Sequence, residues 1–413
     1  MPLPLHGVRV LDVTNVLAGP FCSFQLVLLG AEVIKIEHPE NGDLARRLGA
    51  DAKADAALMG ASFVAVNAGK QSVTLNLKAP EGKEIFKQLA AISHVVVENF
   101  RPGVMTRLGL DYETLAKVNP SLVYCAISGF GQDGPLAMRP AYDQVIQGIS
   151  GVMNVTGDER SAPLRVGYPI CDTMGGITAA MAICAALVDS RTTGQGRRID
   201  VSMLEATLAS MGWVVSNYLN AGVEPIPMGN ENFTAAPSGA FRTAEGLLNI
   251  AANEDAQFHK LCEVIRRPEL KTDTRFEERE TRRCNRLAIN REIAPELMKR
   301  TAAEWEKTLI EVGVPAGRVL SVPEILRDEH LAGRNFVSEF EGAAGKQKVT
   351  RGGFLFSEGE ASPHTPAPPL SEHTEMWLSR LGYDPEQIGM TNSAEMRLGH
   401  RPIYCGRDYK SSN

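Results

Sequence analysis

Asp172 occupies an unusual position, between a short apolar run and two glycines in VGYPICDTMGG, residues 166–176. Residues 176–189 are rich in alanine and are expected to be helical, so Asp172 stands where this helix begins. Aspartate is a favoured helix N-cap, and this role alone would explain the residue. The alternative is a carboxylate nucleophile, kept ionised by the helix N-terminus, with the N–H groups of Gly175 and Gly176 receiving an oxyanion.

Cys171 is the competing nucleophile. No histidine lies near it in the sequence, and a buried, inert thiol is the simpler interpretation because free cysteine is commonly a core residue. The seven cysteines form no CxxC pair and are expected to be reduced thiols in a cytoplasmic protein. The eight histidines form no HExxH motif and no His/Cys cluster, so no metal site is expected.

The composition is that of a globular protein. The chain has 413 residues, of which 44% are hydrophobic and 22% charged. A net charge of −6 and a pI near 5.9 argue against a nucleic-acid partner. Residues 1–10 lack the pattern of a signal peptide, and the apolar stretch 177–188 is shorter than a bilayer-spanning helix. We therefore expect neither nucleic acid nor a membrane as a partner.

Strand-like and helix-like segments alternate in the first half of the chain. The expected strands cover residues 8–13, 31–37, 72–77, 94–99 and 122–128, and helices are expected at 15–30, 79–92 and 111–119. This alternation predicts an α/β fold with a doubly wound parallel sheet. Residues 204–222 predict one long helix. From about Glu224, loops rich in Pro, Gly and Asn and charged helices over 255–312 indicate a smaller second domain.

The first strand–turn–helix–strand unit invites comparison with dinucleotide-binding folds. Glu37, at the end of the second expected strand, would suit a ribose hydroxyl. The turn reads TNVLAGP and lacks GxGxxG, so the sequence argues against NAD. A different nucleotide, or a purely structural role for this unit, stays open.

Matching motifs along nearly the whole chain resemble the family III CoA-transferases, the formyl-CoA and carnitine-CoA transferase family. They are LDVTNVLAGPFCSFQLVLLGAEVIKIEHPENGDLAR, NAGKQSVTLNLK, VVVENFRPGVMTRLGL, ISGFGQDGP, AYDQVIQGISG, DTMGG, TGQGRRIDVSM, VPAGRV and PLSEHT. The resemblance implies that Asp172 is the nucleophile, that acyl-CoA is a substrate and that covalent aspartyl intermediates form without a prosthetic group.

The resemblance also implies the architecture. It predicts a Rossmann-like large domain, a second, smaller α/β domain and an interlocked homodimer. We expect residues 1–223 to form the large domain, 224–328 the small domain, and 329–413 a segment that returns to the large domain. By the same resemblance, the CoA-binding residues are expected to be Val16, Ala18, Lys35, His38, Leu75, Lys78, Asn99, Phe100 and Arg107. Lys35 and Lys78 could instead be solvated charges at strand ends.

The alternative within this resemblance is an α-methylacyl-CoA racemase, which exchanges an α-proton with a His–Asp pair. The racemase histidine lies in a GHD element, where this chain has AYD with Tyr142. Tyrosine is a poor proton shuttle at neutral pH, which favours transfer over racemisation. Asp143 fits the acidic residue that supports the nucleophile in the transferases, or it is a turn residue. An inactive CoA-binding homologue is the third alternative.

The acceptor is expected to be a C4–C5 dicarboxylate, with succinyl-CoA as the donor. Leu17 is apolar where the formyl-CoA type has a polar group, and GNENFTAAPSGAF lacks the glycine run of some members, so oxalate and formate are not favoured. Arg47 or Arg165 could bind the second carboxylate of the acceptor, or either could form a structural ion pair. The C-terminal RLGHRPIYCGRDYKSSN has no assigned role.

Overall fold

The computed structural model describes residues 1–343 and 345–384. The C-terminal RLGHRPIYCGRDYKSSN, with Cys405, lies outside the described residues. Contacts divide the chain into two units. The first comprises Met1–Ile146, Tyr168–Ser210 and the described residues from Asn335 onward; the second comprises Gln147–Gly167 and Met211–Arg334. The second unit therefore begins earlier than the expected small domain and takes in residues 147–167 and 211–223.

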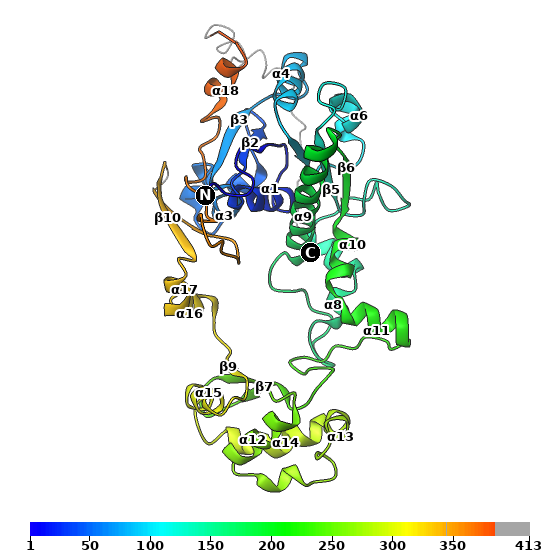
Figure 1. The fold of residues 1–413 in the computed structure, drawn as a ribbon, viewed down its shortest axis with the longest axis vertical. Coiled ribbons are helices and arrows are strands. Elements are labelled where there is room, and N and C mark those ends of the chain that lie inside the picture. The colour runs from blue at the N-terminus through cyan, green and yellow to red at the C-terminus, as the bar shows by residue number, and fades with distance from the viewer. Residues whose placement is uncertain (344, 385–413) are drawn as a thin grey trace, which may run out of the picture. The chain divides into compact units, whose positions relative to one another are not determined.

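A six-stranded parallel sheet forms the centre of the first unit (Figure 1). Its order is β3-β2-β1-β4-β5-β6, with β1 paired to β2 and β4. This is the strand order of a doubly wound Rossmann fold, so the predicted α/β architecture is confirmed. The strands are β1 Arg9–Asp12, β2 Glu32–Glu37, β3 Lys70–Thr74, β4 Val95–Glu98, β5 Val123–Ser128 and β6 Arg198–Ser202.

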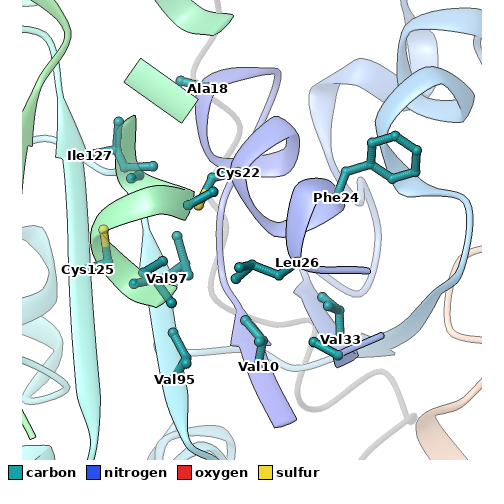
Figure 2. Packing of buried hydrophobic residues seen from close by; sticks show 14 of the residues in the cluster. Val10, Ala18, Cys22, Phe24, Leu26, Val33, Val95, Val97, Cys125 and Ile127 are labelled. Carbon is teal, nitrogen blue, oxygen red and sulfur yellow. The ribbon is translucent and has the colours of Figure 1, made fainter. Parts of the chain in front are cut away.

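Helices cover both faces of this sheet because successive strand residues point to opposite sides. Val10 belongs to a core shared with α1, α3, α9 and α10, whereas Leu11 belongs to one shared with α4, α5, α6 and α18. Figure 2 shows the first core, with Val10, Val33 and Val97 directed toward α1. The helices are α1 Ala18–Leu28, α3 Ala61–Asn67, α4 Pro80–Ala91, α5 Val104–Leu108, α6 Tyr112–Leu115, α9 Ile170–Thr193, α10 Met203–Ser210 and α18 Thr374–Arg380.

The C-terminal segment covers the free edge of β3. The backbone N–H of His373 donates to the carbonyl of Ser72 at 2.9 Å, and Gly69 N–H donates to the carbonyl of Thr365 at 3.0 Å. Trp377 of α18 is buried, and its indole N–H donates to the side chain of Gln71 at 2.7 Å. An edge strand with exposed backbone groups is an aggregation risk, and this segment protects it.

The remaining elements of the first unit are short. They comprise the 3-10 helix Leu44–Arg47, α2 Ala52–Ala56, the start of α7 Asp143–Ile149 and a hairpin of β10 Val337–Gly342 and β11 Gly345–Thr350. Among the described helices, only α9 is long and apolar enough to cross a membrane by length and composition. One side of α9 packs into the first core through Cys171, Ala179, Ile183 and Leu187.

The second unit has its own small sheet and core. Its antiparallel strands β7 Ser238–Arg242, β8 Leu247–Ala251 and β9 Ala316–Arg318 pack with helices around Phe258, Ile289 and Trp305. The helices are α8 Val152–Val155, α11 Trp213–Ala221, α12 Asp255–Val264, α13 Arg279–Cys284, α14 Arg286–Leu297, α15 Ala302–Glu311, α16 Val322–Leu326 and α17 Glu329–Gly333. The single long helix predicted over 204–222 is wrong: it breaks into α10 and α11 at Gly212, whose φ is +44°.

Candidate active site

Asp172 lies within the first turn of α9 and does not cap it. The helix begins at Ile170, after Pro169, so the expected N-cap role is wrong. Asp143 takes over the capping from a distant part of the chain, since its Oδ1 accepts from the backbone N–H of Cys171 at 2.8 Å and of Asp172 at 3.4 Å. This arrangement leaves the Asp172 carboxylate available to the cavity that it lines.

The cavity beside Asp172 has a volume of about 260 Å³. Its walls come from the loops that follow β1 and β4, from the end of β5 and from residues 137–142. The strand order reverses between β1 and β4, and ligands of doubly wound sheets bind in the crevice outside the strand ends at this point. The lining includes Asn15, Val16, Leu17, Ala18, Asn99, Phe100, Arg101, Arg139, Tyr142 and Asp172.

The electrostatics at Asp172 differ from the sequence expectation. Burial and, to a smaller extent, repulsion by the neighbouring Asp143 together raise the pKa of Asp172 to about 7. The helix N-terminus therefore does not keep this carboxylate fully ionised, which corrects the prediction. The acid and its carboxylate coexist at neutral pH, and the carboxylate that does form is poorly solvated. By contrast, burial raises the pKa of Cys171 to about 11, which fits the inert thiol.

Gly175 and Gly176 do not cradle an oxyanion. Both are buried inside α9, where backbone N–H groups serve the hydrogen bonds of the helix. Their function is close packing: a Cβ on Gly176 would lie 2.6 Å from the carbonyl oxygen of Ala18, and one on Gly175 would lie 3.0 Å from Met203. The two glycines thus let α9 approach α1 and α10, and the predicted catalytic role of their N–H groups is wrong.

A second cavity, of about 250 Å³, adjoins the first. Asn15 and Phe100 line both cavities, so the two are neighbours at the carboxyl ends of β1 and β2. Among the expected CoA-binding residues, Val16, Ala18 and Asn99 line the first cavity, Phe100 lines both, and His38, Leu75 and Lys78 line the second. Their contacts with CoA remain predictions. Arg107 is exposed on α5 and lines neither cavity.

Lys35 requires a correction. Its ammonium group is fully buried, donates to the carbonyl of Thr14 at 3.0 Å and forms an ion pair with Asp43 at 2.9 Å. Burial lowers the pKa of Lys35, but the charges of Asp43, Asp12 and Glu37 outweigh it and raise the pKa above its usual range. The side chain is therefore neither a phosphate ligand at the surface nor a solvated strand-end charge.

Two arginines that the sequence argument did not select line the Asp172 cavity. They are Arg101 and Arg139, both exposed. The available signal was their position, since Arg101 lies within ENFRPG and Arg139 directly precedes PAYD. The expected Arg47 is exposed, donates to the carbonyl of Asn41 at 2.7 Å and does not line this cavity. Arg165 belongs to the second unit.

Comparison with known proteins decides the family. The sequence model of CoA-transferase family III matches residues 5–374. The chain belongs to this family. The resemblance found in the sequence is thus confirmed, and the chain is a family III CoA-transferase. Within residues 1–343 and 345–384, no group of three His, Cys, Asp or Glu side chains is placed to hold a metal ion.

Relatives of this CoA-transferase extend over most of its length. It is 34% identical over 382 residues to the succinate–glutarate CoA-transferase of Agrobacterium fabrum, covering 92% of this chain and 96% of the relative. It is 41% identical over 335 residues to the acetyl-CoA:oxalate CoA-transferase of Acetobacter aceti, covering 81% and 85%. The crystal structure of a CAIB/BAIF family protein from Brucella suis matches with a TM-score of 0.82 and 33% identity, over 92% of this chain and 100% of that one.

Proposed function

We propose that this CoA-transferase moves CoA from succinyl-CoA to a short dicarboxylate, with Asp172 as the covalent nucleophile. The observation that carries the proposal is the position of Asp172, whose carboxylate lines a cavity at the point where the strand order of the sheet reverses. The adjoining second cavity gives an extended substrate such as a CoA thioester room to continue beyond Phe100.

The proposed reaction proceeds in four substitutions at carbonyl carbon. The Asp172 carboxylate attacks the thioester of succinyl-CoA, forming a succinyl–aspartyl anhydride and releasing CoA thiolate. The thiolate attacks the aspartyl carbonyl, giving an aspartyl–CoA thioester and free succinate. The acceptor carboxylate attacks this thioester, forming a new anhydride and thiolate again. The thiolate then attacks the acceptor acyl carbonyl, which yields the product thioester and regenerates the carboxylate.

The environment of Asp172 favours the covalent states. Burial and the nearby Asp143 penalise the free carboxylate, as its pKa of about 7 indicates. Neither the anhydride nor the thioester carries a charge on the aspartyl group, so acylation relieves both penalties. Burial and the charge of Asp143 therefore reduce the fraction of Asp172 that is ionised, and they also stabilise the covalent intermediates relative to the free carboxylate.

The acceptor proposal is supported by relatives and by the charge of the cavity. Relatives are named for glutarate, mesaconate and D-citramalate, and one is named for oxalate; all of these acids are dicarboxylates. Arg101 and Arg139 line the cavity beside Asp172 and provide cations for the second carboxylate. Because a relative named for oxalate is 41% identical, oxalate belongs among the acceptors to be tested.

A racemase is the competing function, and the position of Tyr142 argues against it. Tyr142 lines the Asp172 cavity at the place of the racemase histidine, and tyrosine is a poor proton shuttle at neutral pH. An inactive homologue is less favoured because Asp172 retains both its capping partner and its cavity.

The test combines turnover with trapping. The pure protein is incubated with succinyl-CoA and a panel of mono- and dicarboxylic acids without ATP, and new CoA thioesters are measured by mass spectrometry. Hydroxylamine added during turnover should modify Asp172, and Asp172→Ala should lower kcat by roughly 10³ or more. Full activity of that variant, or exchange of an α-proton in deuterated water without CoA transfer, would overturn the proposal.

We also propose that the enzyme is a cytoplasmic homodimer. Helix α11 has no buried residue although it carries Trp213 and Leu219, which are 75% and 73% exposed. Large apolar side chains left exposed on a helix that buries none of its residues favour a surface covered by another chain. The cysteines of the described part of the chain are free thiols, as expected in a reducing compartment. Light scattering of the pure protein measures the mass of the assembly directly.

A further inference from the structure

Val16 adopts a backbone conformation that its side chain disfavours. Its φ is +67°, in the left-handed region, where a β-branched residue is a genuine outlier. Val16 lies in the loop that joins β1 to α1, and it lines the cavity beside Asp172. Such strain persists only where the surroundings hold the backbone in place, and it concentrates at functional sites.

Buried or half-buried side chains hold this loop at successive backbone groups. Asn99 accepts from Asn15 N–H at 2.8 Å and donates to the Asn15 carbonyl at 2.8 Å. Lys35 donates to the Thr14 carbonyl at 3.0 Å. The bond at the strained residue comes from Asp43, whose Oδ1 accepts from Val16 N–H at 2.9 Å.

Asp43 is itself fixed on every side. Its Oδ1 also accepts from Ala45 N–H at 2.9 Å, its backbone N–H donates to Glu37 at 3.0 Å, and its Oδ2 pairs with Lys35 at 2.9 Å. Burial would raise the pKa of Asp43, but the Lys35 ammonium outweighs it and lowers the pKa, so the carboxylate stays charged. A charged acceptor makes a stronger hydrogen bond to a backbone N–H than a neutral one.

We propose that Asp43 is a positioning residue that holds Val16 in its left-handed conformation and thereby presents residues 16–18 to Asp172. This inference rests on the proposed function. Asp43 borders the second cavity, but it is only 1% exposed, so it acts through Val16 and not by touching the substrate. The inference gives a role to the NGDLAR motif, to which the proposed reaction assigns none.

The test compares two double variants that remove the same charges. Lys35→Met/Asp43→Asn keeps an oxygen that accepts from Val16 N–H, whereas Lys35→Met/Asp43→Leu does not. Replacing a buried ion pair by hydrophobic groups of similar volume is often neutral for folding, and urea unfolding of each variant identifies those that are folded when they are compared. Both double variants are prepared in two backgrounds, one with the native Val16 and one with Val16→Gly, since glycine adopts positive φ without the steric cost.

The readouts are kcat/KM for succinyl-CoA and the Kd of CoA by calorimetry. With Val16 present, the Leu variant is expected to have a kcat/KM about 100-fold below that of the Asn variant, because a misplaced loop costs about this much and both variants lack the Lys35 side chain equally. With Val16→Gly, the difference in kcat/KM between the Leu and Asn variants should shrink to about fivefold, because glycine adopts positive φ without the steric cost. The Kd of CoA should follow the same pattern.

Equal losses for the Asn and Leu variants, or an undiminished Leu loss with Val16→Gly, would overturn the inference. A wild-type protein that binds CoA but transfers none would contradict only the proposed function, because the Kd comparison still decides the role of Asp43.

Discussion

Replacing Asp172 by asparagine is expected to stabilise the folded protein while abolishing CoA transfer. Burial, together with a smaller contribution from Asp143, raises the pKa of Asp172 from 3.8 to about 7. Asparagine has nearly the same shape and carries no charge, so the variant removes a group whose ionised form is disfavoured after folding. Loss of the nucleophile and gain of stability should therefore occur together.

The magnitude follows from the pKa. An acid whose pKa is raised on folding contributes stability that is fully present below pH 3.8 and is lost as the pH rises to about 7. At ~1.36 kcal/mol per pH unit, this interval corresponds to about 4 kcal/mol. The Asp172→Asn variant should exceed the wild type by up to about 4 kcal/mol at pH 8 and by less than about 2 kcal/mol at pH 5.

Urea unfolding at pH 5 and pH 8 measures this difference. Asp133→Asn, in an exposed loop, is the matched control and should change the free energy of unfolding by less than about 0.5 kcal/mol at either pH. If the gain in free energy of unfolding of Asp172→Asn over the wild type is not larger at pH 8 than at pH 5, burial does not raise the pKa of Asp172 as argued.

Three further predictions follow from the site. The kcat/KM for succinyl-CoA should rise with pH through about 7 as Asp172 ionises. Asp143→Asn keeps the oxygen that caps α9 but removes the negative charge, so it should move this rise to lower pH. An unchanged pH profile would show that Asp143 does not raise the pKa of Asp172 by charge repulsion. Gly176→Ala should cost about 1–3 kcal/mol in urea unfolding because its Cβ meets a carbonyl of α1, whereas Gly333→Ala, with open space around it, should be neutral. Arg139→Lys should raise the acceptor KM about tenfold and Arg47→Lys should not, since Arg139 lines the cavity and Arg47 does not; equal effects of the two substitutions would refute this choice.

The sheet was predictable because its strands carry local signals. Each expected strand of the first half overlaps an observed strand, from β1 to β5, since buried parallel strands are commonly apolar runs. The exception is β3, which reads KQSVT and overlaps the expected strand only over residues 72–74. The break at Gly212 was not predictable, because helix-forming residues continue on both sides of it. It lies beside the boundary between the two units, at Ser210 and Met211, which is set by contacts between distant segments.

In the site too, features set by neighbouring residues in the sequence were predictable, and features set by distant residues were not. Asp172 was identified from its motif, but its cap role was misjudged because the true capping group, Asp143, comes from another helix. A lysine within a strand is normally exposed, and nothing local to Lys35 shows that Asp43 neutralises it inside the protein. The left-handed conformation of Val16 is likewise imposed by residues outside its own segment. The backbone preference of valine alone would predict a negative φ at this position.

The cover over the edge of β3 has a consequence for the synthesis of the protein. Thr74 in β3 and Thr374 in its cover are 300 residues apart, so a ribosome makes the edge long before the segment that covers it. At about 5–20 residues per second, the nascent strand waits roughly 15–60 s for this partner. During that interval, neighbouring nascent chains can pair with the open edge. Slower translation lengthens the exposure, so the yield of soluble enzyme should depend on the speed of elongation as well as on the stability of the finished fold.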